Sequence, residues 1–172
     1  MRAIRLFIIL CLAGLLAACG FQLRGNYALP FKTMNIALPP NTPLYALLKR
    51  NIESSSPTRI VEDAKDAEAT LSVLADRQEK SILSLNSAGR AREYELVRTF
   101  RFKVSGQNGA EYIPPGQIVI RRDMTYSDDL VLSKESEEVL VWRDIQSDLV
   151  QQLLRRLAAA KLQAPNDDAA AP

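Results

Sequence analysis

Regular alternation of apolar and polar residues in one long segment constrains the fold of this chain more than any other feature. Between residues 92 and 104 the sequence reads REYELVRTFRFKV. A period of two is typical of a strand that is buried on one face only, so we predict a long strand here. The apolar face carries Tyr94, Leu96, Phe100, Phe102 and Val104.

Three further segments are predicted to form the rest of a sheet. Residues 33–38, TMNIAL, alternate as a half-buried strand does, and two prolines follow them. A second strand begins at Ala69 and can run to Leu85, with Asp76 on its polar face. Residues 105–116 are rich in Gly, Asn and Pro, which predicts a long hairpin connection to a strand that begins near Gln117.

Two helices are predicted from spacing and end signals. Asn41 or Thr42 can serve as N-cap for a helix that has Pro43 at its first position and stops before Ser54. The final helix is expected to begin at Ser133 as N-cap, with acidic residues near its start and basic residues near its end. Its apolar stripe is formed by Trp142, Ile145, Leu149, Leu153 and Leu157, and widened by Val139, Val150 and Leu154.

This order of elements predicts an α/β (α+β) fold, a two-layer sandwich with a mixed, roughly four-stranded sheet and two helices packed on one face. The first two strands should be parallel because a helix joins them, and strands joined by hairpins should be antiparallel. Arg98 and Arg122 interrupt the apolar faces of the long strands. We expect both to lie beyond the helices, with the guanidinium groups in water.

The first 18 residues have the layout of a secretory signal peptide. Two arginines precede an apolar run over residues 6–18, and no acidic residue occurs before Glu53. The run is too short for a membrane span, which needs about 20 apolar residues. The four residues LAAC, 16–19, resemble the lipobox of bacterial lipoproteins. That resemblance implies that Cys19 becomes the first mature residue and carries diacylglycerol and an N-linked acyl chain such as palmitate.

The mature chain is predicted to be one domain, residues 19–163, followed by a disordered tail, residues 164–172, that lacks large apolar side chains. Two of the 22 Lys and Arg residues lie in the signal peptide, which leaves 20 against 20 Asp and Glu. A domain without net side-chain charge gives no indication of nucleic-acid binding. Cys11 leaves with the signal peptide and Cys19 is lipidated, so no disulfide can form.

The sequence offers little for catalysis. It contains no histidine, which excludes Ser-His-Asp and Cys-His sites and the commonest zinc ligand. We therefore predict no catalytic residues, no metal and no cofactor, and a binding or structural protein rather than an enzyme. Local basic sites remain: Arg90 and Arg92 lie beside Gly89 in the turn between two long strands, and Lys134 lies near the start of the final helix. We expect these side chains to be exposed, so a phosphorylated ligand could bind there.

Four segments together resemble the LptE family of lipopolysaccharide (LPS) assembly lipoproteins: CGFQLRG after the lipobox, AREYEL, YIPPG and LSKESEE. The resemblance implies an outer-membrane lipoprotein on the periplasmic side that plugs the β-barrel LptD, assists its assembly, binds LPS and delivers it with LptD to the cell surface. Gly20 after Cys19, in place of an aspartate, agrees with outer-membrane sorting.

The resemblance also implies where LPS would bind. Lys134 matches the family pattern directly, and Arg90 and Arg92 match it approximately. An alternative is an accessory lipoprotein of another envelope complex, such as a lipid-transport auxiliary subunit or a secretin pilot. Co-purification with a large outer-membrane barrel would distinguish the two.

Overall fold

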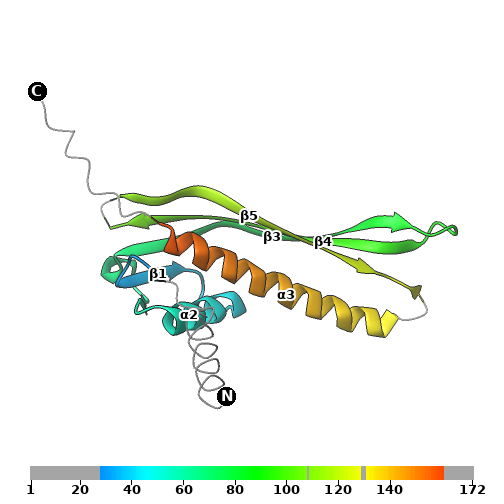
Figure 1. Ribbon diagram of the computed structural model, residues 1–172, viewed down its shortest axis with the longest axis horizontal. Coiled ribbons are helices and arrows are strands. Elements are labelled where there is room, and N and C mark those ends of the chain that lie inside the picture. Colours follow the sequence, from blue (N-terminus) through cyan, green and yellow to red (C-terminus); the bar gives the residue numbers. More distant parts are fainter. Residues whose placement is uncertain (1–27, 108, 129–130, 161–172) are drawn as a thin grey trace, which may run out of the picture.

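The computed structural model describes residues 28–107, 109–128 and 131–160. These form one open mixed sheet with strand order β2-β1-β3-β4-β5 and two helices on one of its faces (Figure 1). The elements in chain order are β1 (Thr33–Ala37), α2 (Pro43–Ser55), β2 (Arg59–Val61), a 3-10 helix (Ala64–Asp66), β3 (Ala69–Leu85), β4 (Ala91–Gly106), β5 (Glu111–Thr125) and α3 (Val131–Ala158).

The predicted α+β fold is confirmed, with one strand more than expected. β1 is parallel to β3, and the pairs β3–β4 and β4–β5 are antiparallel, as predicted. The additional strand is β2, which has three residues and runs parallel to β1 at the edge of the sheet. Three residues are too few to show a period of two, so the sequence pattern missed it.

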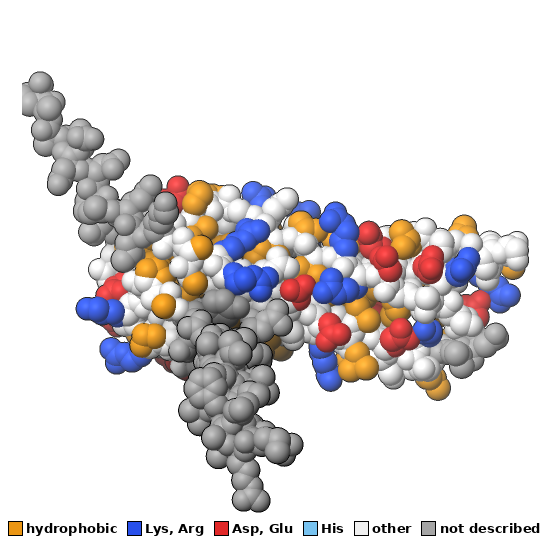
Figure 2. Space-filling view, viewed as in Figure 1, with side chains coloured by type: hydrophobic (Ala, Val, Ile, Leu, Met, Phe, Trp, Pro, Cys, Tyr) orange, Lys and Arg blue, Asp and Glu red, His pale blue; other side chains and the backbone are white. Residues whose placement is uncertain are grey.

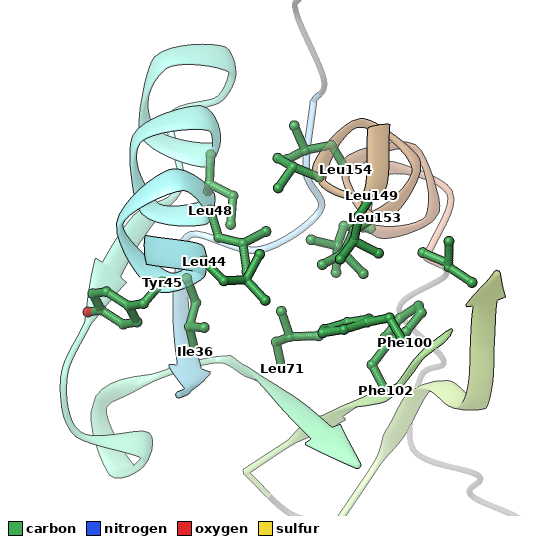
Figure 3. Packing of buried hydrophobic residues seen from close by; sticks show 14 of the residues in the cluster. Ile36, Leu44, Tyr45, Leu48, Leu71, Phe100, Phe102, Leu149, Leu153 and Leu154 are labelled. Carbon is green, nitrogen blue, oxygen red and sulfur yellow. The ribbon is translucent and has the colours of Figure 1, made fainter. Parts of the chain in front are cut away.

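The core lies between the sheet and both helices. Figure 3 shows Leu44 and Leu48 of α2 and Leu153 of α3 directed toward Leu71 and Phe100 of the sheet. These side chains are buried, and burial of each one stabilises the fold by roughly 1.5–3 kcal/mol. The inward positions predicted for the long strand are confirmed as part of this core, namely Leu96, Phe100, Phe102 and Val104.

Helix α2 begins as predicted and ends later. The Oγ1 atom of Thr42, the N-cap, accepts a hydrogen bond from the backbone N–H of Tyr45 at 3.3 Å, and Pro43 is the first helical residue. The predicted stop before Ser54 was wrong by two residues. The hydroxyls of Ser54 and Ser55 donate to a carbonyl one turn back, which keeps these serines inside the helix.

Strand β5 begins at Glu111 rather than near Gln117, so the predicted long connection was wrong. The chain turns within a few residues, where Gly109 has a φ of +75°. Pro114 and Pro115 lie inside β5. They are tolerated because β5 is an edge strand, in which one side of the backbone needs no partner.

Helix α3 begins at Val131, two residues before the predicted N-cap Ser133. Ser133 therefore lies inside the first turn, and the acidic residues fall beyond that turn. The basic residues expected near the end are present in the last turn as Arg155 and Arg156. The predicted stripe packs on the sheet, except that Val139 is exposed.

The prediction for Arg98 was wrong. That for Arg122 was correct in its exposure but not in its position, because Arg122 lies beside α3 and not beyond the helices. Only 3% of Arg98 is exposed, and its Nε and Nη2 donate to the two carboxylate oxygens of Asp76 at 2.9 and 2.7 Å. Its Nη1 donates to Gln146 of α3 at 3.4 Å. Arg122 is exposed and forms an ion pair with Asp148 at 3.0 Å.

A bulge in β3 brings Asp76 to Arg98. The register shifts between Val73 and Ala75, so that Ala75 lies opposite Arg101 and Asp76 lies opposite Phe100. Residues directly opposite in antiparallel strands share a face, so Asp76 is on the inner face and not on the polar face that we predicted.

Candidate functional site

Three segments that are far apart in the sequence meet at one end of the molecule. These are the turn Asn86–Arg90 between β3 and β4, the segment Tyr126–Asp128 after β5, and the first turn of α3 (Figure 1). We call these three segments, with Arg92 at the start of β4, the tip. The backbone N–H of Tyr126 donates to the carbonyl of Arg92 at 2.8 Å, which joins the segment after β5 to the start of β4.

Local hydrogen bonds fix the turn that carries Arg90. The side-chain Oδ1 of Asn86 accepts from the backbone N–H groups of Ala88 and Arg90 at 2.9 and 3.0 Å. Gly89 has a φ of +74°, a conformation that residues with a Cβ atom rarely adopt. We predicted the turn from its glycine and missed the role of Asn86, although an Asn three residues before a Gly is a turn signal.

Arg90 and Arg92 are both accessible at the tip. The side chain of Arg90 is 64% exposed and pairs with Asp128 at 2.9 Å between Nη1 and Oδ2. Exposed ion pairs are weak, typically about 0–1 kcal/mol, so an incoming anion can replace Asp128 at little cost. Arg92 is exposed as well.

The sequence led us to expect an exposed Lys134, but its side chain is largely buried. Its side chain is 14% exposed, and Nζ donates to Glu137 at 2.7 Å and to Thr125 of β5 at 3.1 Å. Because α3 begins at Val131, Lys134 is the fourth helical residue and lies over the end of β5. The structure thus brings Lys134 to the same end as Arg90 and Arg92, with its charge already paired.

A cluster of polar and aromatic side chains lies next to the tip, between the sheet and α3. Lys80 of β3 pairs with Glu138 of α3 at 2.6 Å and lies 4.3 Å from the centre of the Tyr94 ring. The indole N–H of Trp142 donates to Glu138 at 3.3 Å, and the rings of Tyr94 and Tyr126 meet edge to face at 5.2 Å. The cluster connects α3 to the sheet. Sequence reasoning missed it, although the spacing of four between Glu138 and Trp142 was a local signal.

Several sequence predictions fall on residues that the structure does not describe. The signal peptide (residues 1–18), Cys19 and the tail (residues 164–172) all lie outside the described ranges. Within those ranges, no helix is both long and apolar enough to cross a bilayer. The same residues contain no group of three or more Asp, Glu, His or Cys placed to hold a metal ion.

Comparison with known proteins identifies one family. The family model described as LptE, lipopolysaccharide-assembly, matches residues 31–157. The LPS-assembly lipoprotein LptE of Pectobacterium atrosepticum is 31% identical over 161 residues, which cover 89% of this chain and 85% of that protein.

Solved structures agree with these sequence matches. The solution structure of a lipoprotein B from Nitrosomonas europaea is 34% identical with a TM-score of 0.70, covering 81% of this chain and 91% of that one. The crystal structure of the rare lipoprotein B from Shewanella oneidensis is 25% identical with a TM-score of 0.64, covering 74% and 94%. The similarity therefore extends through the sheet and both helices.

Proposed function

Because the chain belongs to the LptE family of lipopolysaccharide-assembly lipoproteins, we propose that it acts with the outer-membrane β-barrel LptD to assemble LPS at the cell surface. The match of the family model to residues 31–157 is the observation that carries this proposal. Family members are assembly lipoproteins and not enzymes. The finer roles proposed below are those of an anchor, a plug and an LPS-binding tip.

The anchor is the lipidated Cys19. Several acyl chains on one residue hold a protein stably at a membrane, whereas a single chain holds it only marginally. The homologues of this chain are lipoproteins, which supports the assignment. Anchoring would hold the domain at the periplasmic side of the outer membrane.

The plug is the elongated sheet inside LptD. The face of the sheet opposite the helices is mostly hydrophilic, with Val97 and Val119 as apolar members, and the interior of large outer-membrane barrels is polar as well. This match of polarity supports the proposal. The cross-strand registers place on that face Arg77 and Glu79 of β3, Thr99 and Arg101 of β4, and Gln117, Arg121 and Asp123 of β5.

The tip would bind the phosphate groups of LPS through Arg90, Arg92 and Lys134. Guanidinium groups bind phosphates through paired hydrogen bonds, and both arginines are accessible. Lys134 would contribute when a phosphate replaces Glu137 as its partner. The tip would then exchange two internal ion pairs for contacts with the ligand.

Co-purification tests the partner. We expect tagged full-length chain, extracted from outer membranes in mild detergent, to retain LptD at an equal molar ratio. A Cys19→Ala variant should fractionate with the outer membrane only in the amount that LptD retains. Purification of the wild-type chain without a large barrel, or its fractionation with inner-membrane markers, would contradict the proposal.

Charge reversal tests the ligand. We expect Arg90→Asp with Arg92→Asp to weaken LPS binding at least tenfold, and Lys134→Asp to weaken it less, because Lys134 is already paired. The matched control is Arg50→Asp with Arg59→Asp, two exposed arginines on α2 and β2 at the other end of the molecule. Equal effects of the two double variants would indicate a general charge effect and no site at the tip.

A further inference from the structure

Two of the three cations at the tip are already paired with carboxylates from the same end of the molecule. Nη1 of Arg90 lies 2.9 Å from Oδ2 of Asp128. Nζ of Lys134 lies 2.7 Å from Oε2 of Glu137. Arg92 is exposed and has no ion pair among the described residues. Figure 2 shows acidic side chains among basic ones over the half of the molecule that carries the tip. A phosphate therefore meets a surface on which carboxylates already occupy two of the cations.

The two ion pairs differ in how well water screens them. In the pair of Arg90 with Asp128 the side chains are 64% and 42% exposed, so their attraction is strongly screened. The side chain of Lys134 is only 14% exposed, and its Nζ also donates to Oγ1 of Thr125 at 3.1 Å. Because screening weakens with burial, the pair with Glu137 is the stronger of the two. Displacement of Glu137 is therefore the larger cost of ligand binding at the tip.

Glu137 can leave Lys134 and return to it without disturbing the fold. Its side chain is 43% exposed, and its only side-chain bond among the described residues is the one to Lys134. A phosphate that reaches Nζ takes the place of this carboxylate, because both are anionic acceptors for the same N–H donors. When the phosphate leaves, Glu137 is three residues away on the same side of α3 and forms the pair again. Lys134 thus alternates between an internal partner and the ligand.

We propose that Glu137 competes with LPS phosphate for Lys134, and that this competition lowers the affinity of the tip and speeds the release of LPS. This inference rests on the proposed function and adds a residue that sets how tightly the ligand is held. A protein that delivers LPS must also release it. Because the carboxylate is in place, Lys134 does not remain as an unpaired, largely buried charge when the phosphate leaves. Asp128 acts on Arg90 in the same way, with a smaller effect because that pair is more exposed.

Glu135 provides a matched control for Glu137. Both are glutamates of α3 within one turn of Lys134, but Glu135 is exposed and has no ion pair among the described residues. Glu135→Gln and Glu137→Gln therefore change the net charge of the tip by the same amount. Only Glu137→Gln removes the competitor for Lys134. The Glu135→Gln variant thus measures the general effect of charge on the attraction of anionic LPS.

The test measures binding of LPS in a nonionic detergent to the full lipidated chain, with association and dissociation rates recorded separately. We expect Glu137→Gln to tighten binding about fivefold and Asp128→Asn about twofold, with a smaller gain for Glu135→Gln. Most of the gain from Glu137→Gln should appear as slower dissociation, as is usual among variants of one complex. When Lys134→Met is also present, Glu137→Gln should give no gain, because the cation for which Glu137 competes is absent.

The inference is overturned if Glu137→Gln tightens binding no more than Glu135→Gln, if the gain persists without Lys134, or if it appears only as faster association. In each of these cases the LPS-binding tip still stands, provided that Arg90→Asp with Arg92→Asp weakens binding. Failure of that double variant to weaken binding, or absence of LPS binding by the wild-type chain, overturns the LPS-binding tip and this inference together.

Discussion

Removal of the carboxylate that pairs with Arg98 should destabilise the fold more than removal of Arg98 itself. Asp76→Ala deletes two charge-assisted hydrogen bonds and leaves a guanidinium that is 3% exposed with one long bond to Gln146. Leaving a buried charge unpaired costs about 3–5 kcal/mol. The side chain of Asp76 is 29% exposed, so water can reach part of the vacated space and we expect about 2–3 kcal/mol.

Arg98→Met removes the buried charge and keeps much of the side-chain volume. Asp76 then remains without its partner, but its exposure allows hydration. Replacing a buried ion by an apolar side chain of similar size is often nearly neutral, so we expect a loss below about 1.5 kcal/mol. The double variant Asp76→Ala with Arg98→Met should be close to Arg98→Met alone. The two substitutions would thus be strongly non-additive.

Urea and thermal unfolding measure these differences through the fluorescence of Trp142, the single tryptophan of the chain. For a domain of this size each kcal/mol lowers Tm by about 2–4 °C, so Asp76→Ala should lower it by roughly 4–12 °C. The reasoning is refuted if Asp76→Ala is no more destabilising than Arg98→Met, or if the losses add in the double variant.

Three substitutions test other parts of the structure by the same unfolding measurements. Leu153→Ala empties a fully buried position of α3 and should cost about 2–5 kcal/mol; a smaller loss would mean that the core collapses around the gap. Thr42→Ala removes the acceptor for the Tyr45 N–H and should cost about 1 kcal/mol, whereas Thr42→Ser should cost little; equal losses would exclude the cap as the cause. Gly89→Ala should cost about 1–2 kcal/mol from backbone strain alone, because no atom lies within 4 Å of the added Cβ. Gly89→Asn should recover part of that loss, and the strain argument fails if it does not.

The strands and helices that were predicted correctly are those whose signal is local and periodic. The alternation in β4 and the leucine spacing in α2 and α3 each depend on which residues face one core. Strand β2 depends instead on a distant contact. The side-chain amide of Asn35 in β1 donates to the carbonyls of Val61 and Glu62 at 3.1 and 2.8 Å, and a sequence of three residues contains no trace of that pairing.

The errors at Arg98 and Lys134 have a shared physical origin. In each case a shift of one or two residues moved a charged side chain onto another surface. The bulge near Ala75 turned Asp76 inward, where it pairs with Arg98. The start of α3 at Val131 placed Lys134 over β5 instead of at the solvent-facing end. A side-chain period identifies faces reliably only while the register is uninterrupted.

The division of this molecule into a packed end and an open end decides what substitutions at the tip can reveal. Fully buried side chains such as Leu48 and Leu153 lie between the sheet and both helices, whereas Arg90 and Arg92 are exposed. Stability depends chiefly on buried apolar area, so variants of the exposed side chains should change ligand binding with little change in unfolding. The buried Arg98 joins β3, β4 and α3 through its bonds to Asp76 and Gln146. Loss of Asp76 should therefore weaken binding and stability together, unlike any single substitution of an exposed tip residue.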